Sequence, residues 1–130
     1  MRKTFYISII FFFGMLFQSN AQTFSPEQQR GLDSLNVIIN NPQSHDTVVA
    51  LTHIEIANYY YLKNPDTAIV MCKKAEIISE HINYTKGKSE SYGWLGYLVQ
   101  HQGNIALALE YYGKSLNIFE EIGDKKGMAH

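Results

Sequence analysis

The stretch TAIVMCKKAEIISEHINYTKG, residues 67–87, decides the fold because a related stretch, LALEYYGKSLNIFEEIGDKKG, follows 40 positions later at residues 107–127. Seven of the 21 paired positions are identical, where unrelated sequences of average composition share about one or two. The identical residues of the first copy are Ala68, Lys74, Ile78, Glu80, Ile82, Lys86 and Gly87. A repeat of this length is typical of a solenoid that stacks two-helix units.

Apolar residues recur at helical spacing in both copies and before each of them. The stripe of the first copy is Ala68, Cys72, Ala75, Ile78 and Ile82, and that of the second is Ile105, Ala108, Tyr112, Ser115, Phe119 and Ile122. The helices expected before them carry Val49, His53, Ile56 and Tyr60, and Tyr92, Leu95, Gly96 and Val99. No run alternates with a period of two, so the sequence predicts an all-α fold without a sheet.

Turn and capping residues predict where these helices begin and end. Ser25-Pro26-Glu27-Gln28 has the pattern of a capping box with proline in the first helical turn. Asp46 is the expected cap of the next helix, and the break at 63–66 offers Asn64 or Asp66 as the cap of the one after. The loop 83–86 and the turn 102–104 separate the later helices. A new element is expected from Gly123.

Composition limits the chain to one domain's worth of sequence and excludes several function classes. The 130 residues carry 11 basic and 12 acidic side chains. This near-neutral balance argues against a nucleic-acid partner. The single cysteine, Cys72, excludes an internal disulfide and a four-thiolate metal site. Cys72 is therefore expected to be a small buried residue of a helix.

The first 21 residues have the organisation of a secretory signal peptide. Arg2 and Lys3 precede an apolar run over 5–17, and small residues at Ser19 and Ala21 mark a cleavage site after Ala21. We therefore expect an exported, periplasmic protein that begins at 22. The alternative is an uncleaved membrane anchor, but the run is shorter than the ~20 residues that a span needs.

At the repeated residues the chain resembles the tetratricopeptide repeat family, whose signature combines aromatic residues, a Leu-Gly pair and Ala-x3-aromatic. The second unit matches it with Tyr92, Leu95, Gly96, Val99, Ala108 and Tyr112. The first unit has His53, Ile56, Ala57, Tyr60, Ala68 and Cys72 at the same places. The chain departs from the pattern in its 40-residue period, in the missing closing prolines, and at Val99 and Cys72.

The resemblance implies an antiparallel helix-pair solenoid. Residues 22–45 would form a leading helix and linker, and 46–130 the repeat region. Its units would span about 46–85 and 86–123, with a third beginning over 124–130. Gly96 and Ala57 would let the two helices of each unit approach closely.

Motifs for chemistry are absent from the sequence. The five histidines include no pair three or four residues apart, so no helix presents a paired metal site. No nucleophile elbow or phosphate-binding glycine loop occurs. We expect no catalytic residue, no metal and no cofactor.

The expected function is binding of a protein or peptide partner, because in tetratricopeptide arrays the first helix of each unit lines the concave surface. The residues at that surface would be Asn58, Tyr61, Tyr97, Gln100 and His101. Asn58 stands where some family members clamp a partner's carboxylate, but the accompanying basic residues are missing. Self-association through an open end of the second unit is also expected.

A different class of function stays open. Exported repeats of this kind also resemble the sensor segments of bacterial signalling proteins. In those proteins a membrane helix and a histidine kinase or DNA-binding output domain follow the repeats. On that reading the chain is an N-terminal sensor segment, and its contact with the membrane lies in the signal peptide or beyond His130.

Overall fold

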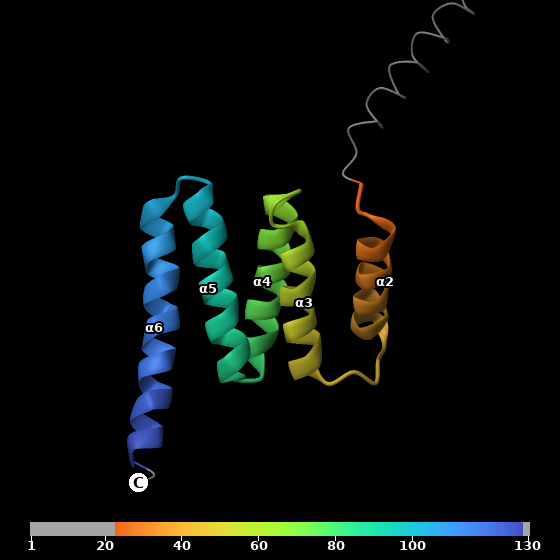
Figure 1. Cartoon of the computed structure of the whole chain (residues 1–130). Coiled ribbons are helices and arrows are strands. Elements are labelled where there is room, and N and C mark those ends of the chain that lie inside the picture. The colour runs from red at the N-terminus through yellow and green to blue at the C-terminus, as the bar shows by residue number, and fades with distance from the viewer. Residues whose placement is uncertain (1–22, 129–130) are drawn as a thin grey trace, which may run out of the picture.

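The computed structural model describes residues 23–128, and for 124–128 it describes the backbone alone. The predicted signal peptide lies outside these residues. The described chain contains five helices and no strand, which confirms the all-α prediction (Figure 1). They are α2 (Pro26–Asn40), α3 (Asp46–Tyr60), α4 (Pro65–His81), α5 (Thr85–His101) and α6 (Ile105–Met128). None of these helices is both long enough and apolar enough to cross a membrane.

Successive helices run in opposite directions and stand side by side in a row (Figure 1). Each helix packs on the one before it in the chain, and α5 also contacts α3. The α3–α4 and α5–α6 pairs are the closest partners, and α4 joins the two pairs by packing on α5. The surfaces of α3 and α5 therefore lie next to each other although 24 residues separate the two helices.

Side-chain caps start two of the helices as the sequence predicts. The Ser25 hydroxyl accepts a hydrogen bond from the Gln28 amide, and the Gln28 side chain accepts one from the Ser25 amide, which completes the capping box. Asn64 rather than Asp66 caps α4, because its side-chain oxygen accepts from the Thr67 amide.

The predicted cap at Asp46 is wrong. His45 occupies the N-cap position of α3 without a side-chain hydrogen bond, and Asp46 is the first helical residue. A carboxylate in the first turn still favours the helix through its macrodipole. The start of α5 is also earlier than expected, because the helix begins at Thr85 inside the predicted loop.

Two residues with positive φ end α4 and α5. Asn83 has a φ of 51° and Gly103 a φ of 87°. Beyond each of them the chain turns back. The Tyr84 amide donates a hydrogen bond to the Ser79 carbonyl oxygen, and the Asn104 amide donates one to the Val99 carbonyl oxygen. This is the hydrogen-bond pattern of a Schellman motif, which needs a left-handed residue after the helix.

The predicted new element at Gly123 does not appear. Gly123 corresponds to Asn83 in the 40-residue repeat, but it remains helical and α6 continues to Met128. Helix propagation is favourable until a residue leaves the helical region. Glycine permits the left-handed turn without requiring it.

The core lies between α3, α4, α5 and α6 and follows the predicted stripes in part. Its buried members are Ala57, Ala68, Cys72, Tyr92, Leu95, Leu98, Val99, Ala108 and Tyr111. Ala57, Leu98 and Tyr111 join it from outside the stripes, whereas Ile105 and Phe119 of the last stripe are exposed. Gly96 permits the close approach of α5 and α6, since a Cβ added there would lie 2.7 Å from the Tyr112 ring. His53 is buried as expected, and its Nδ1 lies 2.8 Å from the Val49 carbonyl oxygen.

Candidate functional site

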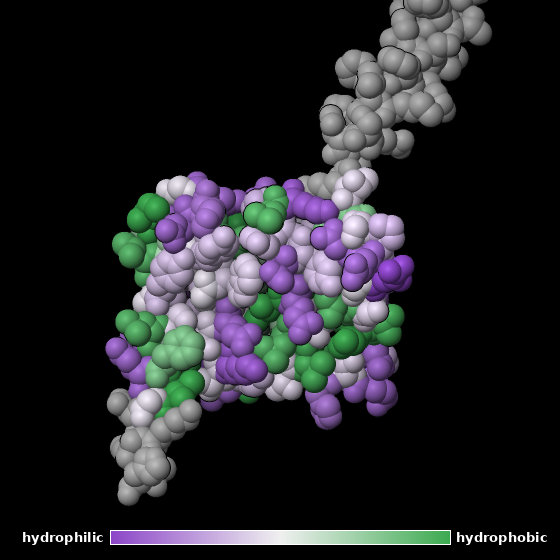
Figure 2. All heavy atoms as spheres, viewed as in Figure 1, coloured by the Kyte–Doolittle hydropathy of each residue, from purple (hydrophilic) through white to green (hydrophobic). Residues whose placement is uncertain are grey.

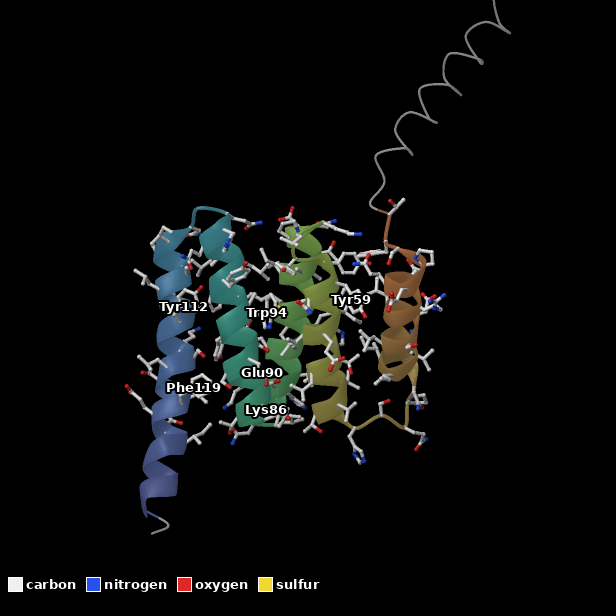
Figure 3. The ribbon with its side chains drawn as sticks, viewed as in Figure 1. Tyr59, Lys86, Glu90, Trp94, Tyr112 and Phe119 are labelled. Atoms are coloured by element: carbon white, nitrogen blue, oxygen red, sulfur yellow. The ribbon has the colours of Figure 1, made fainter. Side chains whose placement is uncertain are left out.

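A groove with a volume of about 500 Å³ opens where the end of α3, the outer side of α5 and one side of α6 meet. We call it the aromatic groove. It is lined by Asn58, Tyr61, Ser89, Glu90, Gly93, Trp94, Tyr97, Ser115 and Phe119. Trp94 and Glu90 lie one above the other on α5, and Phe119 extends from α6 into the space beside α5 (Figure 3).

Three aromatic rings form one wall of the aromatic groove and hold one another in place. The ring centroids of Tyr61 and Trp94 are 5.7 Å apart, those of Trp94 and Tyr97 5.9 Å, and those of Tyr61 and Tyr97 6.2 Å. All three pairs meet edge to face, which is the favoured arrangement of aromatic quadrupoles. These contacts favour the arrangement of the three rings that the structure shows.

Small residues keep the floor of the aromatic groove open. Gly93 has no side chain, and a Cβ added there would lie 4.0 Å from the Ser115 hydroxyl. That hydroxyl donates to the Ser89 carbonyl oxygen at 3.1 Å, which ties α6 to α5 below the groove. Serine and glycine at these three positions leave room that larger side chains would fill.

The rim carries charge of both signs. The Lys86 ammonium lies 3.9 Å from the Glu90 carboxylate, and the two side chains are 63% and 40% exposed. Exposed pairs of this kind contribute little to stability. A shallow second hollow of about 290 Å³ adjoins the groove and adds Glu55 to the rim. The surface is therefore slightly acidic rather than neutral at this end.

Three of the five residues predicted from the sequence line the aromatic groove, namely Asn58, Tyr61 and Tyr97. The other two lie on α5 beyond it. The Gln100 side chain accepts a hydrogen bond from the Tyr112 hydroxyl at 2.8 Å, so it is engaged with α6. The His101 ring packs on Tyr97 with 4.2 Å between centroids, and its Nδ1 lies 2.9 Å from the Tyr97 carbonyl oxygen.

The residues that complete the wall and the far side, Glu90, Trp94 and Phe119, are not predicted from the repeat register. Glu90, Trp94 and Tyr97 are spaced by four and three, which places them on one face of α5 and is a signal that periodicity contains. The apolar spacing predicts that Phe119 lies in the packing stripe of the last helix. Its side chain is instead 58% exposed and lies at the edge of the groove.

The most strongly shifted titratable groups lie in the core. Burial raises the pKa of the Cys72 thiol to about 12. Burial also raises the pKa of the Tyr92 phenol, which donates a hydrogen bond to Glu80. Desolvation lowers the pKa of His53, and nearby Lys74 lowers it further, although the hydrogen bond to Val49 opposes both. In the described part of the chain, no three acidic, histidine or cysteine side chains gather as a metal site would require.

Comparisons of the chain with protein-family models, with curated proteins and with solved structures found no match.

Proposed function

We propose that this chain is a protein-binding module of the tetratricopeptide repeat type, an antiparallel helix-pair solenoid whose aromatic groove binds a peptide segment of another exported or membrane protein. The internal repeat supports this reading, because its two copies fall on α4 and α6. The close contact of Gly96 with Tyr112 also supports it, because the family signature places a small residue and an aromatic residue at these positions.

The observation that carries the binding proposal is the ordered triangle of Tyr61, Trp94 and Tyr97 beside an open groove. Tyr97 is 37% exposed although it packs on the rings of Tyr61, Trp94 and His101. Rings that are already ordered lose little conformational entropy when a ligand covers them. Aromatic anchors of this kind dominate the energetics of many protein interfaces.

The polar groups of the groove favour a peptide backbone as the ligand. The Asn58 side chain is exposed and lines both the aromatic groove and the adjoining hollow. A side-chain amide donates and accepts hydrogen bonds, which matches the alternation of N–H and C=O groups along a peptide. Glu55 and Glu90 add a preference for a basic residue near this end of the groove.

The test begins with peptides selected from a random library on the immobilised protein. Their affinities are then measured by calorimetry for the native protein, for Tyr97→Ala and for Val70→Ala. Val70 is 50% exposed on α4 and lies outside the groove. We expect Tyr97→Ala to weaken binding by about 30-fold, as for loss of a ~2 kcal/mol hot spot. Val70→Ala should leave the affinity unchanged.

Equal affinities for the two variants would place binding elsewhere on the molecule. A selection that yields no peptide above background would contradict the proposal altogether.

A further inference from the structure

The second hollow beside the aromatic groove lies between α3 and α5, and we call it the side hollow. Its lining comes from one face of each helix, namely Leu51, Ile54, Glu55 and Asn58 of α3, and Lys86, Glu90 and Trp94 of α5. The three residues of α5 follow one another at intervals of four along the helix (Figure 3). Asn58, Glu90 and Trp94 line both cavities, so the side hollow continues directly from the aromatic groove.

The two carboxylates of the side hollow are not saturated by the fold. Glu55 is exposed and forms no hydrogen bond or ion pair with any residue in the described part of the chain. Glu90 is 3.9 Å from the Lys86 ammonium, which is longer than the roughly 2.7–2.9 Å of a charge-assisted hydrogen bond. Two negative charges and one positive charge leave the side hollow with a net charge of −1. It therefore complements a cation.

Apolar surface in the side hollow suits the stem of a long cationic side chain. Ile54 is buried, with 5% of its surface exposed, and Leu51 is half-buried. In the lower half of Figure 2, hydrophilic side chains over α5 and α3 stand on either side of hydrophobic ones. The methylene groups of arginine and lysine pack on such apolar surface while the charged end stays near water. Trp94 adds an indole ring, the strongest cation–π partner among the aromatic side chains.

We propose that the side hollow binds one arginine side chain of the peptide that occupies the aromatic groove. A planar guanidinium donates hydrogen bonds in several directions, so it serves Glu55 of α3 and Glu90 of α5 together while its face packs on Trp94. A lysine ammonium is a compact point charge without this planar surface. The ligand is therefore a peptide with an apolar side chain for the aromatic groove and an arginine for the side hollow.

This inference rests on the proposed peptide-binding function and names the charged side chain that its ligand carries. Peptides selected from the random library on the immobilised full chain should contain an arginine at a constant distance from an apolar residue. The tightest of them is then synthesised with arginine, with lysine or with citrulline at that position. Citrulline keeps the planar shape and removes the charge. By calorimetry, the lysine peptide should bind at least about threefold more weakly than the arginine peptide, and the citrulline peptide at least about tenfold more weakly.

Variants of the protein show whether the two carboxylates hold the arginine. The double variant Glu55→Gln with Glu90→Gln should bind the arginine peptide at least about tenfold more weakly, but the citrulline peptide within about twofold of the native protein. The matched control is Glu110→Gln, which removes an exposed carboxylate of α6 outside both cavities. It should change neither affinity by more than about twofold. Circular dichroism should show native helix content for each variant.

Lys86→Gln tests the sign of the charge that the side hollow receives. This variant removes the cation that competes for Glu90, so it should tighten binding of the arginine peptide by about threefold. Weaker binding in Lys86→Gln would overturn the proposal, because Lys86 would then pair with an anionic group of the peptide.

The remaining outcomes separate this proposal from the one on which it rests. Selected peptides without arginine, equal binding of the arginine and lysine peptides, or equal effects of the double variant on the arginine and citrulline peptides would overturn the arginine site. If those peptides still lose affinity in Tyr97→Ala, the peptide-binding function stands without it. A selection that yields no peptide overturns both proposals.

Discussion

Burial in the core controls the chemistry of two single residues. His53 and Cys72 occupy the corresponding packing stripes of α3 and α4, and Cys72 has no exposed surface. The helical spacing of apolar residues predicts that both lie inside the fold, because each falls within a stripe of mostly apolar residues. The spacing does not predict how far burial shifts the pKa of each residue, because that shift depends on the neighbouring residues in the folded protein.

The lowered pKa of His53 makes stability depend on pH. The unfolded chain protonates this imidazole near pH 6.5, whereas the native protein does so only at lower pH. Below about pH 6.5 the unfolded state therefore binds more protons than the native state. The free energy of unfolding decreases as the pH falls through this range, by at most ~1.4 kcal/mol per pH unit. Denaturant unfolding between pH 7 and pH 5 measures this slope.

The variant His53→Gln should lose that part of the slope because glutamine does not titrate. His45→Gln, at the exposed N-cap position of α3, should retain it. The same pH dependence in the native protein and in His53→Gln would contradict the assignment.

Cys72 should be nearly inert in the folded protein. The thiolate is the reactive form, and burial raises the pKa of this thiol to about 12. We expect alkylation by iodoacetamide at pH 8 to be at least about a hundredfold slower in the native protein than in denaturant. A native rate close to the unfolded rate would show that α4 opens readily or that the thiol is accessible.

Helix packing at the scale of elements depends on small residues at defined positions. Gly96 of α5 lies against the Tyr112 ring of α6. Gly113 directly follows Tyr112, but a Cβ added at Gly113 would have no heavy atom within 4 Å. Both glycines are helical, so alanine raises helix propensity at either site by up to ~1 kcal/mol. Only at Gly96 does the new methyl group collide with a packed ring.

We therefore predict opposite effects for the two alanine variants. Gly96→Ala should lower the free energy of unfolding by ~1–3 kcal/mol because it overpacks the α5–α6 contact. Gly113→Ala should leave it unchanged or raise it by up to ~1 kcal/mol. Thermal unfolding of the two proteins gives the comparison, and a stabilised Gly96→Ala variant would contradict the close helix contact.

The helices and most of their ends could be predicted because local signals determine them. Ser25 and Asn64 cap their helices through hydrogen bonds to residues three positions away. The end of α6 was not predictable in the same way. Asn83 and Gly123 occupy the same place in the repeat, but only Asn83 adopts a positive φ. Both residue types permit the left-handed turn, so their place in the repeat does not predict which of them ends its helix.

The aromatic groove belongs to the scale of the whole molecule, because α3, α5 and α6 all contribute to it. The repeat register predicts Asn58, Tyr61 and Tyr97. It does not predict Phe119, because the stacking of the helices, rather than spacing within one of them, determines which side of α6 remains uncovered. It wrongly predicts Gln100, because the hydrogen bond of Gln100 with Tyr112 forms only when α5 and α6 meet.

Trp94 provides a direct measurement of the central claim, that the aromatic groove is where a partner binds. It is the single tryptophan of the chain, it lines the groove, and it contacts Tyr61 and Tyr97. An indole that moves from water into an apolar contact emits at shorter wavelength. Titration of the full chain with a library-selected peptide should shift Trp94 emission to shorter wavelength and saturate at the calorimetric stoichiometry. Calorimetric binding without any change in Trp94 emission would contradict the claim.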